Sequence, residues 1–422
     1  MYFNYFNRDV LKMHVIGIII LLISIGVNNT AVADNYDFDE ILPPNWSSSF
    51  AHGNNDNGDI VGYGKVGAII KAFHYSNGSY SELMPPGWSS AYALRINSSS
   101  EIVGYGNDGD IDKGFIYHDG TYSELLPPDW EWAWAIRNNN IGDVVGGGGY
   151  GSSIKAFLFS SGSYSELLPP GWTVSFAYGI NNMGEIVGNG YDSEGVTKAF
   201  KYSNGTYTEI IPPGWTESLA YGINNGGEIV GNGVNGNGNH YGYHYHNGIF
   251  TEIVPPAWND IVLEDINNNG DITGYGNDGL TIKGFIYRNG AYTVLLPPDV
   301  LRSRAIGINN MGQVVGRGYN AEGSMGIGFA ATPCQISPVR IIGSPITYYS
   351  SLQDAYDAAN EGSTIESHDV IFQDDLILDL NKIITMRGGY DCAYSYVTGN
   401  TTLNGNLTID NGIVVMQNFH LQ

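Results

Sequence analysis

Apolar and polar residues alternate in short runs along most of this chain, and glycine, asparagine or proline separates many of the runs. Alternation of this kind, rich in aromatic and β-branched residues, predicts β-strands with one buried face. Four runs between residues 175 and 211 ("SFAYGIN", "EIVGNGY", "TKAFKYS" and "TYTEII") predict strands over residues 175–181, 185–191, 197–203 and 206–211. Asn204-Gly205, between the last two runs, predicts a two-residue hairpin turn, because both residues tolerate positive φ.

This four-strand unit repeats. Pro-Pro pairs occur at intervals of 42 or 43 residues and begin at Pro43, Pro85, Pro127, Pro169, Pro212, Pro255 and Pro297. Four antiparallel strands in about 42 residues is the size of one blade of a β-propeller. The sequence therefore predicts an all-β protein with a seven-bladed β-propeller over residues 34–332.

The two ends of the array predict how the propeller closes. The seventh unit supplies three strands and stops without a fourth, whereas "FDEILPP" (38–44) matches the fourth-strand sequence "YSELMPP" (80–86) position for position. Residues 38–42 can complete the last blade by pairing with residues 326–332, which leaves no open sheet edge. An open stack of repeats would instead carry polar caps at its ends.

The repeated residues include Ala-Phe in the third strand and Ile-Asn-x-x-Gly-x-x-Val-Gly across the first turn, as in Ala199-Phe200 and in Ile180 to Gly188. With these motifs the chain resembles the HAF-type extracellular repeat of secreted bacterial proteins, over roughly residues 36–332. It departs from that repeat where a histidine precedes Ala-Phe, because Lys71, Lys155 and Lys198 stand there. The resemblance implies export and a β-repeat fold, and it implies no reaction.

Residues 1–33 have the pattern of a signal peptide. Arg8 and Lys12 precede a 13-residue apolar run over residues 15–27, and small residues at 31–33 fit a cleavage site. Because a membrane span needs about 20 apolar residues, a cleaved leader is favoured over an uncleaved anchor. We expect bacterial-type export to the periplasm, the cell surface or the medium, with no membrane span after cleavage.

The 42-residue period ends before residue 333. Residues 333–422 contain a short helical segment at 352–359, followed by apolar strand segments that resemble coils of about 20 residues. This stretch is similar to the N-terminal cap and first turns of a pectin-lyase-like right-handed β-helix, so we predict a small β-helix-like module. Cys334 and Cys392 are the two cysteines of the chain, and in an exported protein they predict one disulfide, with two free thiols as the alternative.

Charge excludes one class of partner. The formal net charge is −24 at pH 7, and 14% of the residues are charged. Nucleic-acid binding requires basic patches that contact phosphates, so nucleic acid is excluded as a partner. The charge does not identify a ligand or an oligomeric state.

A candidate binding rim follows from what varies between the repeats. The connector tryptophans recur in six units, as expected for packing, whereas the residues just after them differ from unit to unit. Repeat proteins conserve framework positions and vary the positions that build a ligand surface. Because these variable residues enter the first strand of each blade at one rim, we predict a ligand-binding rim made by Trp132, Glu217, Asp260, Arg302 and Arg304.

Two groups of residues are candidates for metal binding. His240, His244 and His246 lie in the longest loop and its strand, where three histidines could hold Zn²⁺; alternation with tyrosine also suits a half-exposed strand. "DINNNGD" (265–271) resembles a Ca²⁺ loop, although the 12-residue pattern with its final bidentate glutamate is missing. Turn chemistry is favoured over weak Ca²⁺ binding for these acids and asparagines, and no other cofactor is predicted.

The lysines before Ala-Phe have a structural interpretation. With a two-residue turn at Asn77-Gly78, Lys71 and Glu82 become diagonal neighbours on one sheet face. The same spacing recurs in three further units, at Lys113 and Glu124, Lys155 and Glu166, and Lys198 and Glu209. A ladder of ion pairs is favoured over a catalytic lysine.

These patterns favour an exported binding or interaction protein that recognises a glycan or a surface polymer through one rim of the propeller. The alternatives are a propeller-fold glycan hydrolase or lyase and a structural surface repeat protein. Enzymes built on symmetric folds place unlike catalytic groups in one or two repeats. No paired acid and base or serine–histidine constellation can be assigned from the sequence, so we predict no catalytic residue.

Overall fold

The computed structural model describes residues 20–22, 36–320, 326–334 and 337–422. Two compact units emerge, residues 36–333 and a unit that contains residues 334–422, and each is described by itself below. Most of the predicted signal peptide lies outside the described residues; within it, β1 (Ile20–Leu22) pairs in parallel with β38 (Ile413–Gln417). No helix among the described residues is long and apolar enough to cross a membrane.

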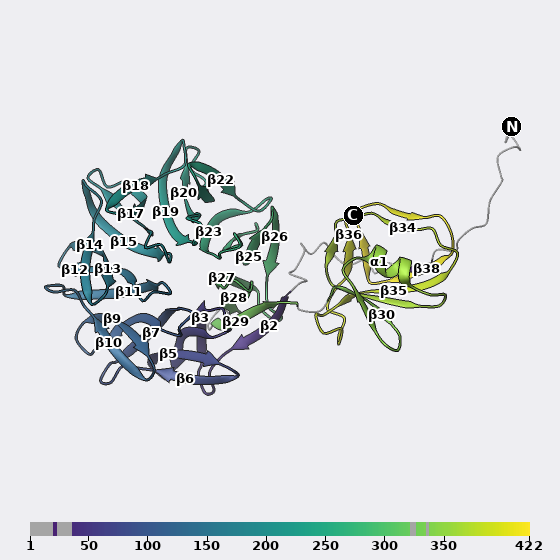
Figure 1. The fold of residues 1–422 in the computed structure, drawn as a ribbon, viewed down its shortest axis with the longest axis horizontal. Helices are drawn as coiled ribbons and strands as arrows, with labels where there is room; N and C mark the ends of the chain where they lie inside the picture. The colour runs from purple at the N-terminus through teal and green to yellow at the C-terminus, as the bar shows by residue number, and fades with distance from the viewer. Residues whose placement is uncertain (1–19, 23–35, 321–325, 335–336) are drawn as a thin grey trace, which may run out of the picture. The chain divides into compact units, whose positions relative to one another are not determined.

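The first unit is built from four-stranded antiparallel sheets, the architecture of a β-propeller (Figure 1). The first three repeats contain β3 (Ser48–Asn54), β4 (Ile60–Val66), β5 (Ile69–Ser76), β6 (Ser79–Leu83), β7 (Ser90–Ile96), β8 (Ile102–Asn107), β9 (Asp112–His118), β10 (Thr121–Leu125), β11 (Trp132–Asn138), β12 (Val144–Tyr150), β13 (Ser153–Ser160) and β14 (Ser163–Leu167). The sheets of the third and fourth repeats are joined by a parallel bridge between Ile154 and Val174.

The remaining repeats follow the same order. They contain β15 (Trp172–Ile180), β16 (Ile186–Asp192), β17 (Thr197–Ser203), β18 (Thr206–Ile210), β19 (Trp215–Ile223), β20 (Ile229–Asn235), β21 (His240–His246), β22 (Ile249–Ile253), β23 (Asn259–Ile266), β24 (Ile272–Asn277), β25 (Ile282–Arg288), β26 (Ala291–Leu295), β27 (Arg302–Ile308), β28 (Val314–Tyr319) and β29 (Gly326–Pro333). The four strands predicted between residues 175 and 211 are confirmed, with β15 starting three residues earlier. Asn204 and Gly205 have φ values of 49° and 81°, as the predicted hairpin turn requires.

The N-terminal strand belongs to the same sheet as the last repeat. Strand β2 (Tyr36–Ile41) pairs antiparallel with β29, with Phe38 opposite Ala331 and Ile41 opposite Gly328. The predicted pairing of the N-terminal strand with residues 326–332 is therefore confirmed. We call the first strands of the seven repeats the inner strands; they are β3, β7, β11, β15, β19, β23 and β27. Each inner strand contacts the inner strand of the next repeat, and β27 contacts β3 (Figure 1).

Asparagines at the first turn of each repeat connect neighbouring sheets. Asn224, which is buried, shows the pattern: its Nδ2 donates to Glu228 Oε2 at 2.6 Å and to the Asn267 carbonyl of the next repeat at 3.0 Å. Its Oδ1 accepts the amides of Gly226 and Glu228 within its own turn. The donor bond to the next repeat is made by all seven, Asn55, Asn97, Asn139, Asn181, Asn224, Asn267 and Asn309, the last of which donates to the Asn55 carbonyl.

Aromatic rings and small residues fill the core of each sheet. In the first repeat, Trp46 of the connector packs edge-on against Phe73 of β5, with ring centroids 6.0 Å apart. An equivalent pair recurs in five further repeats, with Tyr243 in place of phenylalanine in one of them. Apolar clusters also cross between sheets, since Ile41 and Val315 of the last sheet pack with Phe73 of the first. Burying this much aromatic area stabilises both the sheets and their contacts.

The four predicted ion pairs between the third and fourth strands of a repeat are present. Lys113 Nζ lies 2.9 Å from Glu124, and Lys198 Nζ lies 3.2 Å from Glu209. Equivalent contacts join Lys71 to Glu82 and Lys155 to Glu166. In the sixth repeat, where no glutamate is available, Lys283 pairs with Asp278 at 2.7 Å. These lysines therefore have carboxylate partners on the sheet surface.

The second unit begins with β30 (Val339–Ile342) and β31 (Thr347–Tyr349), followed by α1 (Leu352–Ala358). The chain then forms β32 (Thr364–His368), β33 (Ile371–Phe372), β34 (Leu376–Leu378), β35 (Ile383–Tyr390), β36 (Thr401–Leu403), β37 (Leu407–Ile409), β38 and β39 (Phe419–Leu421). These strands pair in parallel in three ladders, β32-β35-β38, β33-β36-β39 and β34-β37. The predicted disulfide between Cys334 and Cys392 is present.

Candidate functional site

The predicted rim residue Trp132 lines a surface hollow of about 550 Å³. It lies at the start of β11 and is half-buried, while the hollow is completed by Asn107, Asp110, Ile111, Asp112 and Glu131. Asp112 is fixed in place because its two oxygens accept hydrogen bonds from Asn107 Nδ2 at 2.9 Å and from Trp134 Nε1 at 3.1 Å. Asp110 and Glu131 are exposed. The hollow thus combines one aromatic ring with several hydrogen-bond acceptors.

The other predicted rim residues lie on other sheets. Glu217, Asp260 and Arg302 are exposed near the starts of β19, β23 and β27, and Asp260 has a φ of 51°. Arg304 follows Arg302 by two residues on β27 and is half-buried. Among the described residues, no hydrogen bond, ion pair or ring contact joins these four side chains to Trp132. The structure therefore brings Trp132 together with Asp112 and Glu131, which the sequence did not single out.

Aromatic side chains extend from this hollow across the first and second strands of the first three repeats. Trp134 is 5.1 Å from Trp132 and 4.9 Å from Tyr105, measured between ring centroids. The series continues through Tyr92 and Tyr63 to Phe50, with successive centroid distances of 4.8, 4.8 and 5.3 Å. We call this series the aromatic belt; its members are Trp132, Trp134, Tyr105, Tyr92, Tyr63 and Phe50.

A glycine makes room for the belt at its Trp132 end. Phe176 of β15 lies 6.2 Å from Trp132 and 6.5 Å from Trp134, again between ring centroids. A Cβ atom on Gly147 of β12 would lie 2.2 Å from the Phe176 ring, which is far inside van der Waals contact. The equivalent positions of other repeats carry Tyr63 and Tyr105. Gly147 therefore allows Phe176 to support the two tryptophans.

Three arginines at the other end of the belt lie over aromatic rings. Arg302 and Arg317 lie over the Tyr319 ring, and their Cζ atoms are 5.5 and 4.9 Å from its centroid. Arg317 also lies 5.4 Å from the Phe50 centroid, and Arg304 lies 4.6 Å from that of Tyr275. We call Arg302, Arg304 and Arg317 the arginine patch.

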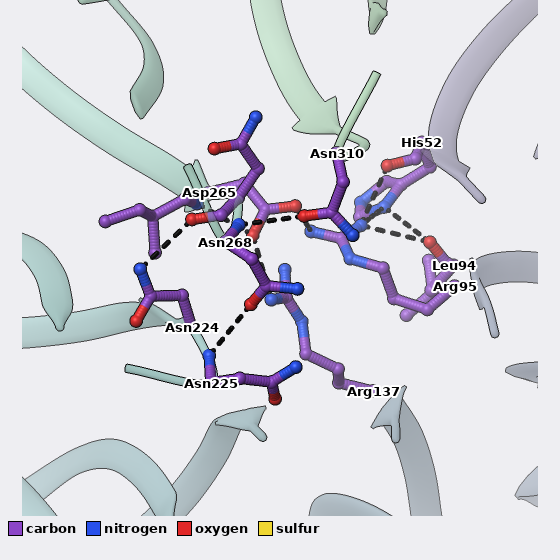
Figure 2. A network of polar contacts seen from close by, with 11 residues as sticks. His52, Leu94, Arg95, Arg137, Asn224, Asn225, Asp265, Asn268 and Asn310 are labelled. Carbon is purple, nitrogen blue, oxygen red and sulfur yellow. Dashed lines mark hydrogen bonds and ion pairs between the residues drawn. The ribbon is translucent and has the colours of Figure 1, made fainter. Parts of the chain in front are cut away.

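A second charged group, here called the central cluster, joins inner strands that are far apart in sequence (Figure 2). Arg137 Nη1 donates to Asp265 Oδ1 at 2.9 Å, and Arg95 Nη2 lies 4.0 Å from Asp265 Oδ2. Arg95 also donates to the carbonyls of His52 and Leu94. Because Arg137 and Asp265 are buried, this ion pair is shielded from solvent and links β11 to β23.

Glu264 is the unpaired acid beside the central cluster. It makes no hydrogen bond or ion pair among the described residues. Burial raises its pKa from the ordinary 4.5 to about 7, and the nearby positive charge of Arg95 limits the rise. Burial also lowers the pKa of His52 well below its usual value, an effect that Arg95 reinforces. At neutral pH, therefore, His52 is uncharged and Glu264 is only partly ionised.

The central cluster was not predicted, although the sequence contains a signal for it. The inner strands share a position that is glycine in four repeats, Gly53, Gly179, Gly222 and Gly307, and charged in three, Arg95, Arg137 and Asp265. In all seven repeats, the pairing of the first two strands shifts register just before this position. Comparing repeats at this position, rather than just after the connector tryptophan, would have found the cluster.

The predicted histidines do not meet at one point. His244 Nε2 and His246 Nδ1 lie 3.8 and 3.6 Å from Glu228 Oε1, whereas His240 is exposed at the opposite end of β21. Among the described residues, no group of three or more histidine, cysteine or acidic side chains is arranged to hold a metal ion. In the segment likened to a Ca²⁺ loop, Asp265 pairs with Arg137 and Asp271 pairs with Arg288 at 2.8 Å, so both carboxylates have cationic partners.

Repeated four-stranded sheets around a set of inner strands place the first unit in the β-propeller class. No family model matches the chain, and no curated protein matches it. Among solved structures it is similar to a catalytically inactive virginiamycin B lyase from Staphylococcus aureus, with 16% identity, 70% of this chain and 99% of that chain covered, and a TM-score of 0.47.

Two further solved structures are similar at lower identity. The Aleuria aurantia lectin, in complex with a fucosylated disaccharide, has 13% identity over 60% of this chain and 96% of its own, with a TM-score of 0.36. A Mycobacterium tuberculosis puromycin-hydrolyzing peptidase has 11% identity over 69% of this chain and 53% of its own, with a TM-score of 0.46.

Proposed function

We propose that the protein is an exported, glycan-binding β-propeller whose seven repeats form a ring closed by the N-terminal strand. The support for closure is the pairing of β2 with β29, together with the Asn309 bond to Asn55. The parallel ladders of residues 364–421 support the short β-helix proposed for the C-terminal module. Export follows from the leader pattern of residues 1–33 and fits the disulfide of the C-terminal unit.

The observation that carries the proposal is the hollow beside Trp132. An indole face can stack on the apolar face of a sugar ring, and carboxylates at its edge can accept hydrogen bonds from the sugar hydroxyls. Asp112 is held in position by Asn107 and Trp134, so it is ordered before any ligand binds. Asp110 and Glu131 are exposed at the same hollow and offer further acceptors.

The position of Trp132 in the repeat also supports a binding role. The framework tryptophans pack edge-on against the phenylalanine or tyrosine of their own sheet, whereas Trp132 comes two residues after one of them, Trp130. The equivalent residues of the other repeats are small, aliphatic or charged. Packing of the repeat therefore does not require an aromatic ring at this position.

A glycan array probed with the wild-type protein and with Trp132→Ala tests the proposal. We expect the wild type to bind a defined group of glycans and Trp132→Ala to lose that signal, with little change in melting temperature. Binding by the folded variant at wild-type level would contradict the proposal.

Trp172→Ala is the matched control, because it removes the same side chain from a framework position. Trp172 is half-buried and packs 5.9 Å from Phe200, between ring centroids. Its loss should cost about 2–4 kcal/mol of folding free energy, with the array signal of the folded fraction retained.

A further inference from the structure

The arginine patch is unusual in a chain of net charge −24. The arginines with carboxylate partners are Arg95, Arg137, Arg288 and Arg340. Among the described residues, Arg302, Arg304 and Arg317 have no hydrogen bond or ion pair. All three lie on the paired strands β27 and β28, with Arg304 directly opposite Arg317. Three guanidinium groups without an ion-pair partner among the described residues thus gather on one sheet.

Stacking on aromatic rings fixes these guanidinium groups without satisfying their N–H donors. Arg317 lies over Phe50 and Tyr319, and its Nε is buried with no acceptor. Arg304 lies over Tyr275. A guanidinium that stacks by one face keeps its in-plane donors free, and those donors match the two oxygens of a carboxylate. The patch is therefore preorganised for an oxyanion that the described chain does not provide.

Nearby acids do not neutralise the patch fully. Asp265 is already shared between Arg95 and Arg137 of the central cluster. Glu264, which lies within electrostatic range of Arg304, carries a partial charge at neutral pH because burial raises its pKa to about 7. Like charges close together repel, and an anionic ligand would relieve that repulsion.

The aromatic belt begins where the patch lies. Phe50, under Arg317, is followed by Tyr63 at 5.3 Å between ring centroids, and the belt then runs to the hollow at Trp132. A ligand that reaches both ends would present an anionic group to the arginines and sugar faces to the rings. Saccharides that carry carboxylates combine these two features.

We propose that the arginine patch binds the carboxylate of a uronic acid, so that the glycan recognised by this protein is an acidic saccharide. The inference rests on the proposed function for the saccharide part of the ligand, and on the patch for its charge. Arg304 and Arg317 hold the carboxylate, and Arg302, which is exposed at the edge of the patch, attracts it.

Calorimetric titration of the full chain with D-galacturonate, D-galactose, acetate and inorganic phosphate tests the inference. We expect galacturonate to bind at least 10-fold more tightly than galactose or acetate, and raised salt to weaken it. Equal affinity for galactose would overturn the role of the charge. Equal or tighter binding of acetate or phosphate would overturn the saccharide assignment.

Substitutions locate the binding. Arg304→Gln and Arg317→Gln should each lower the affinity for galacturonate at least 10-fold. Arg387 is an exposed arginine of the other unit, and Arg387→Gln should leave this affinity unchanged. Arg302→Gln should lower the affinity for galacturonate several-fold. Because Arg302 is exposed, this variant should fold even if the variants at the half-buried Arg304 and Arg317 do not. Unchanged affinity in Arg302→Gln and in every folded variant of Arg304 or Arg317 would overturn the inference.

The same titration separates this inference from the proposed function. Trp132→Ala removes the hollow and leaves the patch intact, so it should lose the array signal and keep its affinity for galacturonate. If the wild-type protein binds galacturonate but gives no signal on the array, the glycan hollow is contradicted and the patch is supported. Array binding by neutral glycans without galacturonate binding would support the hollow and overturn the patch.

Discussion

At the scale of single residues, equivalent positions of the repeats separate framework from function. Gly179 and Gly222 have the same place in their strands as Arg137 and Asp265, which form a buried ion pair between two sheets. A framework position tolerates such a change only if the new charge finds a partner, because an unpaired buried charge is costly. Glu264 has no such partner among the described residues, and its pKa, raised by burial, reflects the cost.

Glu264 gives a prediction on the pH dependence of stability. Its folded pKa of about 7 lies above the ordinary 4.5, so below about pH 4.5 the carboxyl is protonated in both states and folding carries no penalty. As pH rises from 4.5 to about 7, the unfolded state loses this proton more readily than the folded state, so the free energy of unfolding falls. Above about pH 7 the loss reaches its full value. Glu264→Gln cannot ionise, so it should be more stable than the wild type by about 3 kcal/mol at pH 8 and nearly equal at pH 4.5.

Denaturant unfolding at several pH values measures this difference. The charged and titratable groups near Glu264 are Arg95, Arg137, Asp265, Arg304, Tyr221 and Tyr275, and all of them are retained in the variant. Glu252→Gln, at an exposed position of β22, is the control and should show no such trend. A constant difference between Glu264→Gln and wild type from pH 4.5 to pH 8 would show that Glu264 is not the responsible group.

At the scale of strands and turns, the turn asparagines act between repeats as well as within them. Their enrichment at turns was predicted from local chemistry, and the local bonds are present, as between Asn224 Oδ1 and the amide of Glu228. The second role, donation to the next repeat, depends on how adjacent sheets are placed. A single repeat carries no signal for it, and the sequence could not reveal it.

Asn224→Ala should therefore destabilise the first unit more than loss of one turn bond would. It removes two donor bonds and two acceptor bonds at a buried site, and we expect a loss of about 2–4 kcal/mol in chemical unfolding. Asn239→Ala makes the same change where the side chain is exposed and forms no hydrogen bond among the described residues. If both variants lose the same stability, the bond between repeats contributes nothing.

Features that depend on local or regularly repeated sequence patterns could be predicted, whereas other contacts between segments far apart in the sequence could not. Strand positions, the Asn204-Gly205 turn, the Lys198–Glu209 pair and the β2–β29 pairing are local or repeat with a fixed period, and the structure confirms them. Trp132 was singled out as a departure from that period. Its neighbours Asp110 and Asp112 belong to the preceding repeat, at the connection from β8 to β9, and strand patterns do not show that this connection lies beside the start of β11.

At the scale of the whole molecule, the N-terminal strand completes the sheet of the last repeat. Phe38 packs edge-on against Phe329 with ring centroids 6.0 Å apart, and Ile41 is buried with Trp46 of the next sheet. Removal of this strand would leave β29 with an unpaired edge, and exposed edges promote aggregation.

Deletion of residues 34–42 should therefore lower the melting temperature strongly or cause aggregation. A synthetic peptide covering residues 34–44, added to the truncated protein, should restore part of the lost stability, because it can pair with β29 as β2 does. Scanning calorimetry with and without the peptide measures both effects. A truncated protein that melts like the full chain would rule out closure by this strand.

Glycan binding at Trp132 is tested most directly by a crystal structure of the protein in complex with the strongest ligand found on the glycan array. We expect a sugar ring against Trp132, with its hydroxyls bonded to Asp112 or Glu131. A ligand bound elsewhere on the molecule, with the hollow at Trp132 empty, would contradict this expectation.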